Sequence, residues 1–169
     1  RPSDVVAVQL PNWWEFTALH LACLHIGAIT NPVMPIFRQR ELSFMLNSAE
    51  SKVFIAPKTF RNYDHQAMIE EFRPGIPKLE HVFFLDGEGE ASFESHFLER
   101  RWEEEVDAEA LFPARRPDPN DIIEILFTSG TSGVPKGVLH TSNTLLSLAD
   151  TGRERLGLTP DDVVFMPSP

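Results

Sequence analysis

A ten-residue stretch gathers the polar groups that suit phosphate binding. Residues 128–137 read TSGTSGVPKG, with four hydroxyl side chains, three glycines and one lysine. Glycine costs backbone entropy inside a helix or strand, and serine and threonine compete for backbone hydrogen bonds, so the stretch predicts a loop. Glycines let backbone N–H groups turn toward a phosphate, the hydroxyls add donors, and the lysine adds a mobile positive charge. The expected ligand is therefore the phosphates of a nucleotide.

The residues expected to contact these phosphates offer a hydroxyl, an unhindered backbone or an ammonium group. They are Thr128, Ser129, Gly130, Thr131, Ser132, Gly133 and Lys136. The alternative is a flexible Ser/Thr/Gly connection. Apolar runs at 122–127 and 137–141 predict a strand before the stretch and a returning strand after it, which favours a loop tied down at both ends. The loop is not the P-loop of common NTPases, because that pattern starting at Gly130 would need glycine in place of Pro135.

Residues 128–137 resemble the phosphate-binding core motif of the adenylate-forming enzymes, which include acyl-CoA synthetases, adenylation domains of peptide synthetases and luciferases. Further stretches are similar to the N-terminal landmarks of that family, in the same order: 4–12, 15–16, 27–32, 41–42 and 51–53. The resemblance implies that residues 1–169 are a fragment of the N-terminal AMP-binding domain of an acyl-CoA synthetase. Residues 1–119 would form a helix-flanked part of the sheet, and residues 120–169 the phosphate-loop hairpin, a helix and a following strand.

The resemblance also implies a reaction. A carboxylate attacks the α-phosphorus of ATP and expels pyrophosphate, and the thiol of coenzyme A then displaces AMP from the acyl-adenylate, with Mg²⁺ assisting. The nucleoside contacts, the acidic metal-binding residue and the catalytic lysine of the family have no counterpart here. We therefore assign no complete catalytic site and no metal ligand, and we expect the isolated chain to be inactive. Residues 11–16 and 31–38 are most similar to acyl-CoA synthetases for alicyclic or short to medium-chain acids.

Two alternatives stay open. The chain could be a non-catalytic structural or interaction domain that retains a phosphate-binding loop, or part of an adenylation domain that loads a carrier-protein thiol. Both ends of the chain resemble cuts within a longer protein. A truncated sheet is expected to expose apolar surface and a strand edge, which favours self-association.

Acidic residues outnumber basic ones, with 25 Asp and Glu against 15 Lys and Arg and a formal charge of −10. A nucleic-acid-binding surface is normally basic, so the composition argues against nucleic acid as a partner. Cys23 is the only cysteine. It is expected to be a small buried apolar side chain, and its isolation fits a reducing cytoplasm. No membrane span is predicted, because the apolar segment 13–29 is interrupted by Glu15, His20 and His25.

Strand and helix patterns alternate along the chain. Strands are predicted at 5–10, 28–33, 52–56, 81–85, 122–127, 137–141 and 163–166. With helices between them, this order predicts an α/β fold, a mostly parallel sheet with helices on both faces. The segment 86–119 interrupts the alternation. Its dense carboxylates lack a tight ligand pattern, so a solvated helical face is favoured over a metal site.

The helices are predicted from caps and apolar spacing. Asn12 should cap a helix that ends at Gly27, is buried on nearly all sides and places Trp13 and Trp14 in the core. A stripe of Leu42, Met45, Leu46 and Ala49 marks a second helix, and Asp64 should cap a third that holds Met68, Ile69 and Phe72. Thr141 or Ser142 should cap a fourth, with Leu145, Leu146, Leu148 and Ala149 on its buried side. His140 is either a ligand contact or a structural hydrogen-bond partner.

Overall fold

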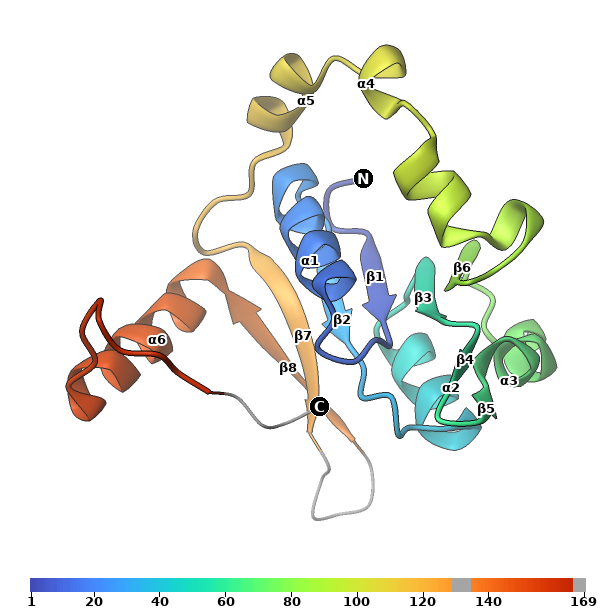
Figure 1. Cartoon of the computed structure of the whole chain (residues 1–169), viewed down its shortest axis with the longest axis horizontal. Coiled ribbons are helices and arrows are strands. Elements are labelled where there is room, and N and C mark those ends of the chain that lie inside the picture. The colour runs from blue at the N-terminus through green and yellow to red at the C-terminus, as the bar shows by residue number, and fades with distance from the viewer. Residues whose placement is uncertain (129–134, 166–169) are drawn as a thin grey trace.

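A six-stranded sheet forms the centre of the computed structural model, which describes residues 1–128 and 135–165 (Figure 1). The strand order is β6-β3-β1-β2-β7-β8. The strands are β1 (Val5–Val8), β2 (Ile29–Pro32), β3 (Val53–Pro57), β6 (His81–Leu85), β7 (Ile122–Thr128) and β8 (Lys136–Thr141). Neighbouring strands pair in parallel as far as β7, and β8 is antiparallel to β7. The predicted mostly parallel sheet is confirmed.

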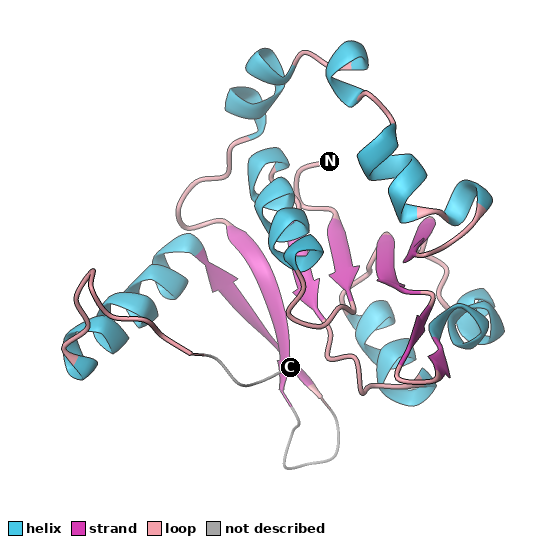
Figure 2. Ribbon diagram, viewed as in Figure 1, coloured by secondary structure: helices cyan, strands magenta, loops and turns pink. Residues whose placement is uncertain are grey.

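Helices cover both faces of this sheet, as predicted (Figure 2). Successive strand residues point to opposite faces, so each strand feeds two separate cores. One core lies under α2 (Gln39–Ser48) and α3 (His65–Phe72), and the other lies under α1 (Trp14–Ile26). The strand residues of the first core are Ala7, Phe54, Ala56, Val82 and Phe84. Those of the second are Val8, Ile55, Phe83 and Leu85.

Short-range signals set the ends of several helices. Gly27 adopts a φ of 69° after α1, the left-handed conformation that glycine accepts readily, and ends the helix as predicted. The Asp64 side chain accepts a hydrogen bond of 2.8 Å from the Ala67 amide at the start of α3, also as predicted. The 3₁₀ turn η1 (Arg73–Gly75) follows α3 directly. The predicted apolar stripe of α2 is buried at Leu42, Met45 and Leu46.

The predictions for α1 were partly wrong. Its N-cap is Trp13 rather than Asn12, and only Leu19 and Cys23 among its residues are buried. Trp14 is 61% exposed, and Trp13 is also exposed, with its ring edge against Phe60. Apolar residues occur around the whole circumference of α1, but other elements do not pack against its whole circumference. Here the sheet covers one face of α1, and α5 (Ala108–Arg115) lies near its end.

Four short elements were not predicted: the two strands of a hairpin and two short helical turns. The paired strands β4 (Thr59–Phe60) and β5 (Tyr63–Asp64) form an antiparallel hairpin in front of α3. The 3₁₀ turn η2 (Gly89–Ala91) and the π-helix η3 (Glu94–Glu99) follow β6, and η3 packs Phe97 against the β6 residue Phe83. Strands of two residues carry no detectable period, which explains why the hairpin was missed.

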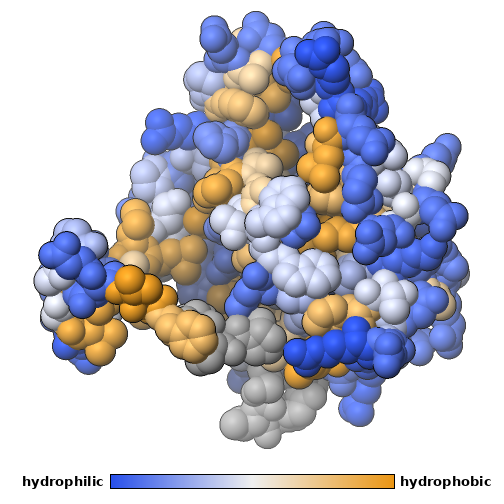
Figure 3. All heavy atoms as spheres, viewed as in Figure 1, coloured by the Kyte–Doolittle hydropathy of each residue, from blue (hydrophilic) through white to orange (hydrophobic). Residues whose placement is uncertain are grey.

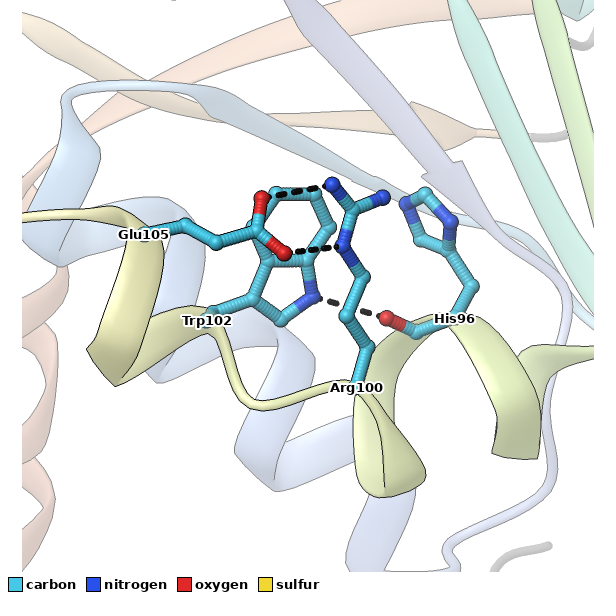
Figure 4. Close-up of polar contacts among 4 residues, drawn as sticks. All are labelled: His96, Arg100, Trp102 and Glu105. Carbon is cyan, nitrogen blue, oxygen red and sulfur yellow. Dashed lines mark hydrogen bonds and ion pairs between the residues drawn. The ribbon is translucent and has the colours of Figure 1, made fainter.

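The segment between β6 and β7 is mostly a solvated surface, as predicted, and a local cluster of contacts holds its middle part together (Figure 4). The Trp102 indole of α4 (Trp102–Glu105) donates a 2.7 Å hydrogen bond to the His96 carbonyl. The Arg100 guanidinium lies 3.8 Å over the Trp102 ring and donates to both carboxylate oxygens of Glu105. These contacts fix the turn between η3 and α4.

The C-terminal helix α6 (Ser142–Leu156) begins at Thr141, whose hydroxyl accepts from the Thr144 amide, and ends at Gly157. Its predicted buried side is wrong: none of its residues is buried, and Leu148 is 69% exposed. Figure 3 shows hydrophobic side chains gathered over α6 and the segment after it. Val163, Val164 and Phe165 form no strand, which contradicts the prediction for them, and Met166 lies outside the described residues. The sequence pattern was apolar, but the described residues supply no surface to cover it.

Candidate phosphate-binding site

Strands β7 and β8 hold the two ends of the predicted phosphate loop. Their antiparallel register pairs Phe127 with Gly137 and, at the last rung, Thr128 with Lys136. The Thr128 hydroxyl donates to the Lys136 carbonyl over 3.5 Å. The side chains of Thr128 and Lys136 are both exposed. The ladder therefore places a hydroxyl and an ammonium group side by side at the base of the connection between the strands.

An aromatic contact anchors this end of the hairpin. A Cβ atom on Gly137 would lie 3.3 Å from the Ile125 side chain and 3.5 Å from the Phe127 ring, so the glycine leaves room for both across the ladder. On the face of the sheet that α2 covers, the edge of the Phe127 ring meets Phe44, with centroids 6.3 Å apart. The last residues of β7 therefore contact α2, and this contact restricts where the neighbouring Thr128 can lie.

Only the two ends of the predicted loop fall within the described residues. Thr128 and Lys136 lie together as the sequence predicted. Ser129, Gly130, Thr131, Ser132 and Gly133 lie outside the described residues, and their proposed contacts with phosphate stay predictions.

The loop leaves the sheet at its carboxyl edge. Strands β1, β2 and β7 run in parallel, so the residues that follow each strand meet at one edge. Ligands of open α/β sheets bind outside this edge. The strand β7 joins next to β2, with Thr30 opposite Glu124. The position of Thr128 is therefore that of a ligand-binding loop in this fold class.

A buried polar group lies deeper in the same ladder. Glu124 is 9% exposed and pairs with His140 of β8 on one side and Thr30 of β2 on the other. The Thr30 hydroxyl lies 3.0 Å from Nδ1 of His20 on α1. His140 is partly buried and lies directly opposite Glu124, and its expected role as a ligand contact or a structural hydrogen-bond partner stays a prediction.

Sequence reasoning missed a second polar group at the carboxyl edge. Gln9, directly after β1, is fully buried and donates from Nε2 to the carbonyls of Met34 and Phe37, over 3.1 and 3.0 Å. Its Oε1 lies 3.2 Å from Nδ1 of the buried His65. Gln9 is the one polar residue in the apolar run 5–10, and this could have marked it as a buried hydrogen-bonding group. Nothing local marked His65 as its partner.

The described part of the chain has neither the side-chain cluster of a metal site nor a membrane-spanning helix. Across residues 1–128 and 135–165, no group of three or more His, Cys, Asp or Glu side chains is placed to hold a metal ion. No helix in this part of the chain is long and apolar enough to cross a bilayer. Cys23 is buried, as predicted, and burial raises the pKa of its thiol despite a hydrogen bond with Thr30.

Comparison with known proteins assigns the family. The sequence pattern of the AMP-binding enzyme family matches residues 1–169. The chain is 36% identical over 166 residues to a medium-chain fatty-acid–CoA ligase of Escherichia coli (strain K12), covering 98% of this chain and 29% of that protein. It is 32% identical over 170 residues to a salicylyl-CoA synthase / salicylate adenylyltransferase of a Streptomyces species, covering 100% of this chain and 31% of that protein.

A solved structure agrees with these relatives. The Mycobacterium tuberculosis fatty acyl CoA synthetase superposes with a TM-score of 0.70 at 25% identity, over 91% of this chain and 27% of that one. The chain thus spans less than a third of the length of the relatives that it matches. The motif at 128–137, the parallel sheet that ends in it and these matches agree, and the chain belongs to the AMP-binding enzyme family, among relatives that are acyl-CoA ligases.

Proposed function

We propose that this chain supplies the ATP-phosphate clamp of a carboxylic acid–CoA ligase. The observation that carries the proposal is the pairing of Thr128 with Lys136 at the carboxyl edge of a parallel sheet, in a chain that belongs to the AMP-binding enzyme family. The exposed hydroxyl and ammonium groups are the types of donor that polyphosphate binding needs. Residues 129–133 would complete the clamp with hydroxyl and backbone donors.

The clamp would act on the first half of the reaction. A carboxylate oxygen bonds to the α-phosphorus of ATP as the bond to the pyrophosphate oxygen breaks, so negative charge builds on the leaving pyrophosphate. Lys136 would stabilise that charge, and Thr128 would donate a hydrogen bond to a phosphate oxygen. The thiol of coenzyme A would then displace AMP. The rigid ladder beneath both residues would hold these donors in place before the reaction starts.

Magnesium would enter with the nucleotide. No cluster of three or more metal-binding side chains occurs in the described residues. Such ions commonly bind through substrate phosphates and a few protein oxygens. We propose that Mg²⁺ neutralises phosphate charge when it is bound to ATP, while Thr128 and Lys136 orient the phosphates.

The domain and substrate proposals follow from the family. Residues 1–119 would be the helix-flanked part of an N-terminal AMP-binding domain, and residues 120–169 would carry its loop hairpin and the helix that follows. The acid would be a short or medium-chain, alicyclic or aromatic carboxylic acid, as the names of the relatives suggest. The chain alone would be inactive, because it spans less than a third of those relatives and holds one part of the site. A carrier-protein thiol as acceptor stays an alternative that a product assay would separate from coenzyme A.

A non-catalytic interaction domain is the second candidate, and the exposed apolar side of α6 favours it. The distinguishing experiment is ATP–pyrophosphate exchange by the parent ligase with Lys136→Ala, Lys136→Arg and Lys78→Ala variants. Lys78 is also exposed, but it lies in the loop before β6 and serves as a matched control. We expect Lys136→Ala to lower exchange by on the order of 10- to 1,000-fold, the scale of one lost charge-stabilising donor. Unchanged exchange in Lys136→Ala would contradict the clamp, and exchange by the 169-residue chain alone would contradict its inactivity.

A further inference from the structure

A tight turn at the carboxyl edge of the sheet has its two ends tied to one side chain. The turn Met34–Phe37 follows β2, and the Phe37 amide donates to the Met34 carbonyl over 3.1 Å. The Gln9 side-chain amide donates to both of those end residues, at the carbonyls of Met34 and Phe37. The turn presents apolar side chains outward, with Met34 49% and Ile36 59% exposed. The Arg38 guanidinium donates to the Pro35 and Phe37 carbonyls of the same turn, over 2.7 and 3.0 Å, so Gln9 from inside and Arg38 from outside set where these two side chains lie.

The bond between Gln9 and His65 fixes the protonation of the histidine. Both of the contacts to carbonyls use Nε2 of Gln9, which must be the NH₂ end because carbonyls only accept. Its Oε1 is then an acceptor, so Nδ1 of His65 must donate across the 3.2 Å that separates them. His65 is consequently the Nδ1–H tautomer. Its Nε2 carries a buried lone pair that finds no hydrogen-bond partner among residues 1–128 and 135–165.

The surroundings of His65 disfavour a second proton on the ring. A proton on Nε2 would be a buried donor without an acceptor, which is costly. The Tyr63 ring lies edge-on at 5.3 Å from the imidazole, and the Arg38 guanidinium lies 3.8 Å from the centre of that Tyr63 ring. Burial, with Arg38 adding to it and Asp64 opposing it, lowers the pKa of His65 to about 4. These are the charged groups that act on the ring from α2 and from the cap of α3.

We propose that His65 is a positioning residue: as the neutral Nδ1–H tautomer it orients the Gln9 amide, and through Gln9 it holds the turn Met34–Phe37 at the edge of the sheet where the phosphate loop begins. Protonation keeps the Nδ1–H donor but adds a buried Nε2–H donor with no acceptor among the described residues, so the charged ring leaves its place and releases this hold. The bond from His65 to Gln9 acts on the turn without any nucleotide. Loss of Phe37 protection and loss of ATP–pyrophosphate exchange therefore test this role and the phosphate clamp independently.

The Phe37 amide is a direct reporter of the turn. Its hydrogen bond to Met34 is the turn's own bond, whereas the backbone amide of Gln9 donates to the Ile55 carbonyl of the neighbouring strand β3 over 2.8 Å. Amide hydrogen exchange of the 169-residue chain, corrected for the intrinsic effect of pH, compares the two sites. The variants are His65→Asn, which keeps a donor at the position of Nδ1 and cannot titrate, and His65→Leu, which has no donor.

We expect His65→Leu to lower protection of the Phe37 amide at pH 7 by on the order of 10-fold or more, with a smaller change at Gln9, since one buried hydrogen bond is lost. His65→Asn should retain protection. In the unsubstituted chain, Phe37 protection should fall as the pH drops toward 4, and in His65→Asn it should not. Equal losses at both amides, failure of His65→Asn to rescue, or a pH-independent turn in the unsubstituted chain would overturn the proposal. If His65→Leu does not fold, the pH comparison alone decides.

Discussion

Thr128 and Lys136 face each other across the last rung of the β7–β8 ladder, joined by a contact of 3.5 Å from the Thr128 hydroxyl to the Lys136 carbonyl. Both side chains are exposed, and that contact is at the long limit of a hydrogen bond. The pair therefore contributes little to the fold, which leaves its side chains available for a ligand. This separation of roles can be tested.

Replacing Thr128 by Val should leave the free energy of unfolding nearly unchanged and should reduce the rate of ATP–pyrophosphate exchange. We expect the free energy of unfolding of the chain to change by less than about 0.5 kcal/mol, because the lost contact is long and exposed. In the parent ligase, ATP–pyrophosphate exchange should fall by roughly 10-fold through loss of one phosphate donor. Thr128→Ser keeps the hydroxyl and is the control. A large loss of stability with normal exchange would assign Thr128 a purely structural role.

Two glycines that end helices should respond differently to the same substitution. Gly27 and Gly157 both have positive φ, 69° and 65°, but a Cβ on Gly27 would lie 2.7 Å from the Arg115 carbonyl, whereas one on Gly157 meets nothing within 4 Å. We expect Gly157→Ala to destabilise the chain by about 1 kcal/mol and Gly27→Ala by about 2 to 3 kcal/mol, because the second adds a backbone clash to the strained conformation. Urea unfolding of both variants gives the comparison. Equal losses would show that Arg115 moves aside.

The pH dependence of folding should carry the signature of His65. Its pKa is lowered to about 4 in the folded chain from an ordinary value of 6.5, so the folded state binds fewer protons than the unfolded state between these values. Stability is then greatest above pH 6.5 and falls as the pH drops, by about 3 kcal/mol by pH 4. Urea unfolding at several pH values should show this slope, and His65→Asn should flatten it. A slope that persists unchanged in His65→Asn would assign it to other groups.

The cluster around His96 gives a second titration. Burial, followed by the charges of Arg100 and His81, lowers the pKa of His96. Replacing Arg100 by Gln should raise that pKa toward its ordinary value, because a neighbouring positive charge disfavours imidazolium. An NMR titration of the His96 ring measures the change, and Arg101→Gln is the matched control, since Arg101 pairs with Glu103 and Glu104 instead. A His96 pKa that does not move would exclude Arg100 as a cause and leave burial and His81.

The apolar side of α6 should drive self-association of the isolated chain. Leu148 and Leu156 are exposed on one side of this helix, and β8 is the last strand of the sheet that the described residues form. We expect the sedimentation coefficient to rise with concentration, and the Leu148→Lys variant to reduce the rise. A monomer at every concentration would count against the interaction-domain alternative.

Local signals in the sequence predicted the elements whose ends depend on nearby residues. The left-handed Gly27, the Asp64 cap and the buried stripe of α2 are settled within one or two turns, and the structure has all three. Two apolar runs around a short connection likewise predicted the β7–β8 hairpin, whose strands extend by one residue each to pair Thr128 with Lys136.

Predictions failed where burial depends on distant surfaces. The apolar residues of α1 and α6 indicated helices but could not say which sides another element covers, so Trp14 and Leu148 were wrongly placed inside. The contact between Gln9 and His65 joins residues 56 positions apart, through a hairpin with no periodic signature. Its discovery required the fold.

The connection between β6 and β7 reaches β7 at its first residues, away from the Thr128–Lys136 rung at the other end of that strand. It passes through η3, α4 and α5 beyond the opposite end of the strands (Figure 1). Its length and composition can therefore vary without altering the register that pairs Thr128 with Lys136. This makes the exposed residues near Glu103 a suitable place to insert a fluorescent reporter or an affinity peptide, and a region where related enzymes can diverge in surface while keeping the same nucleotide chemistry.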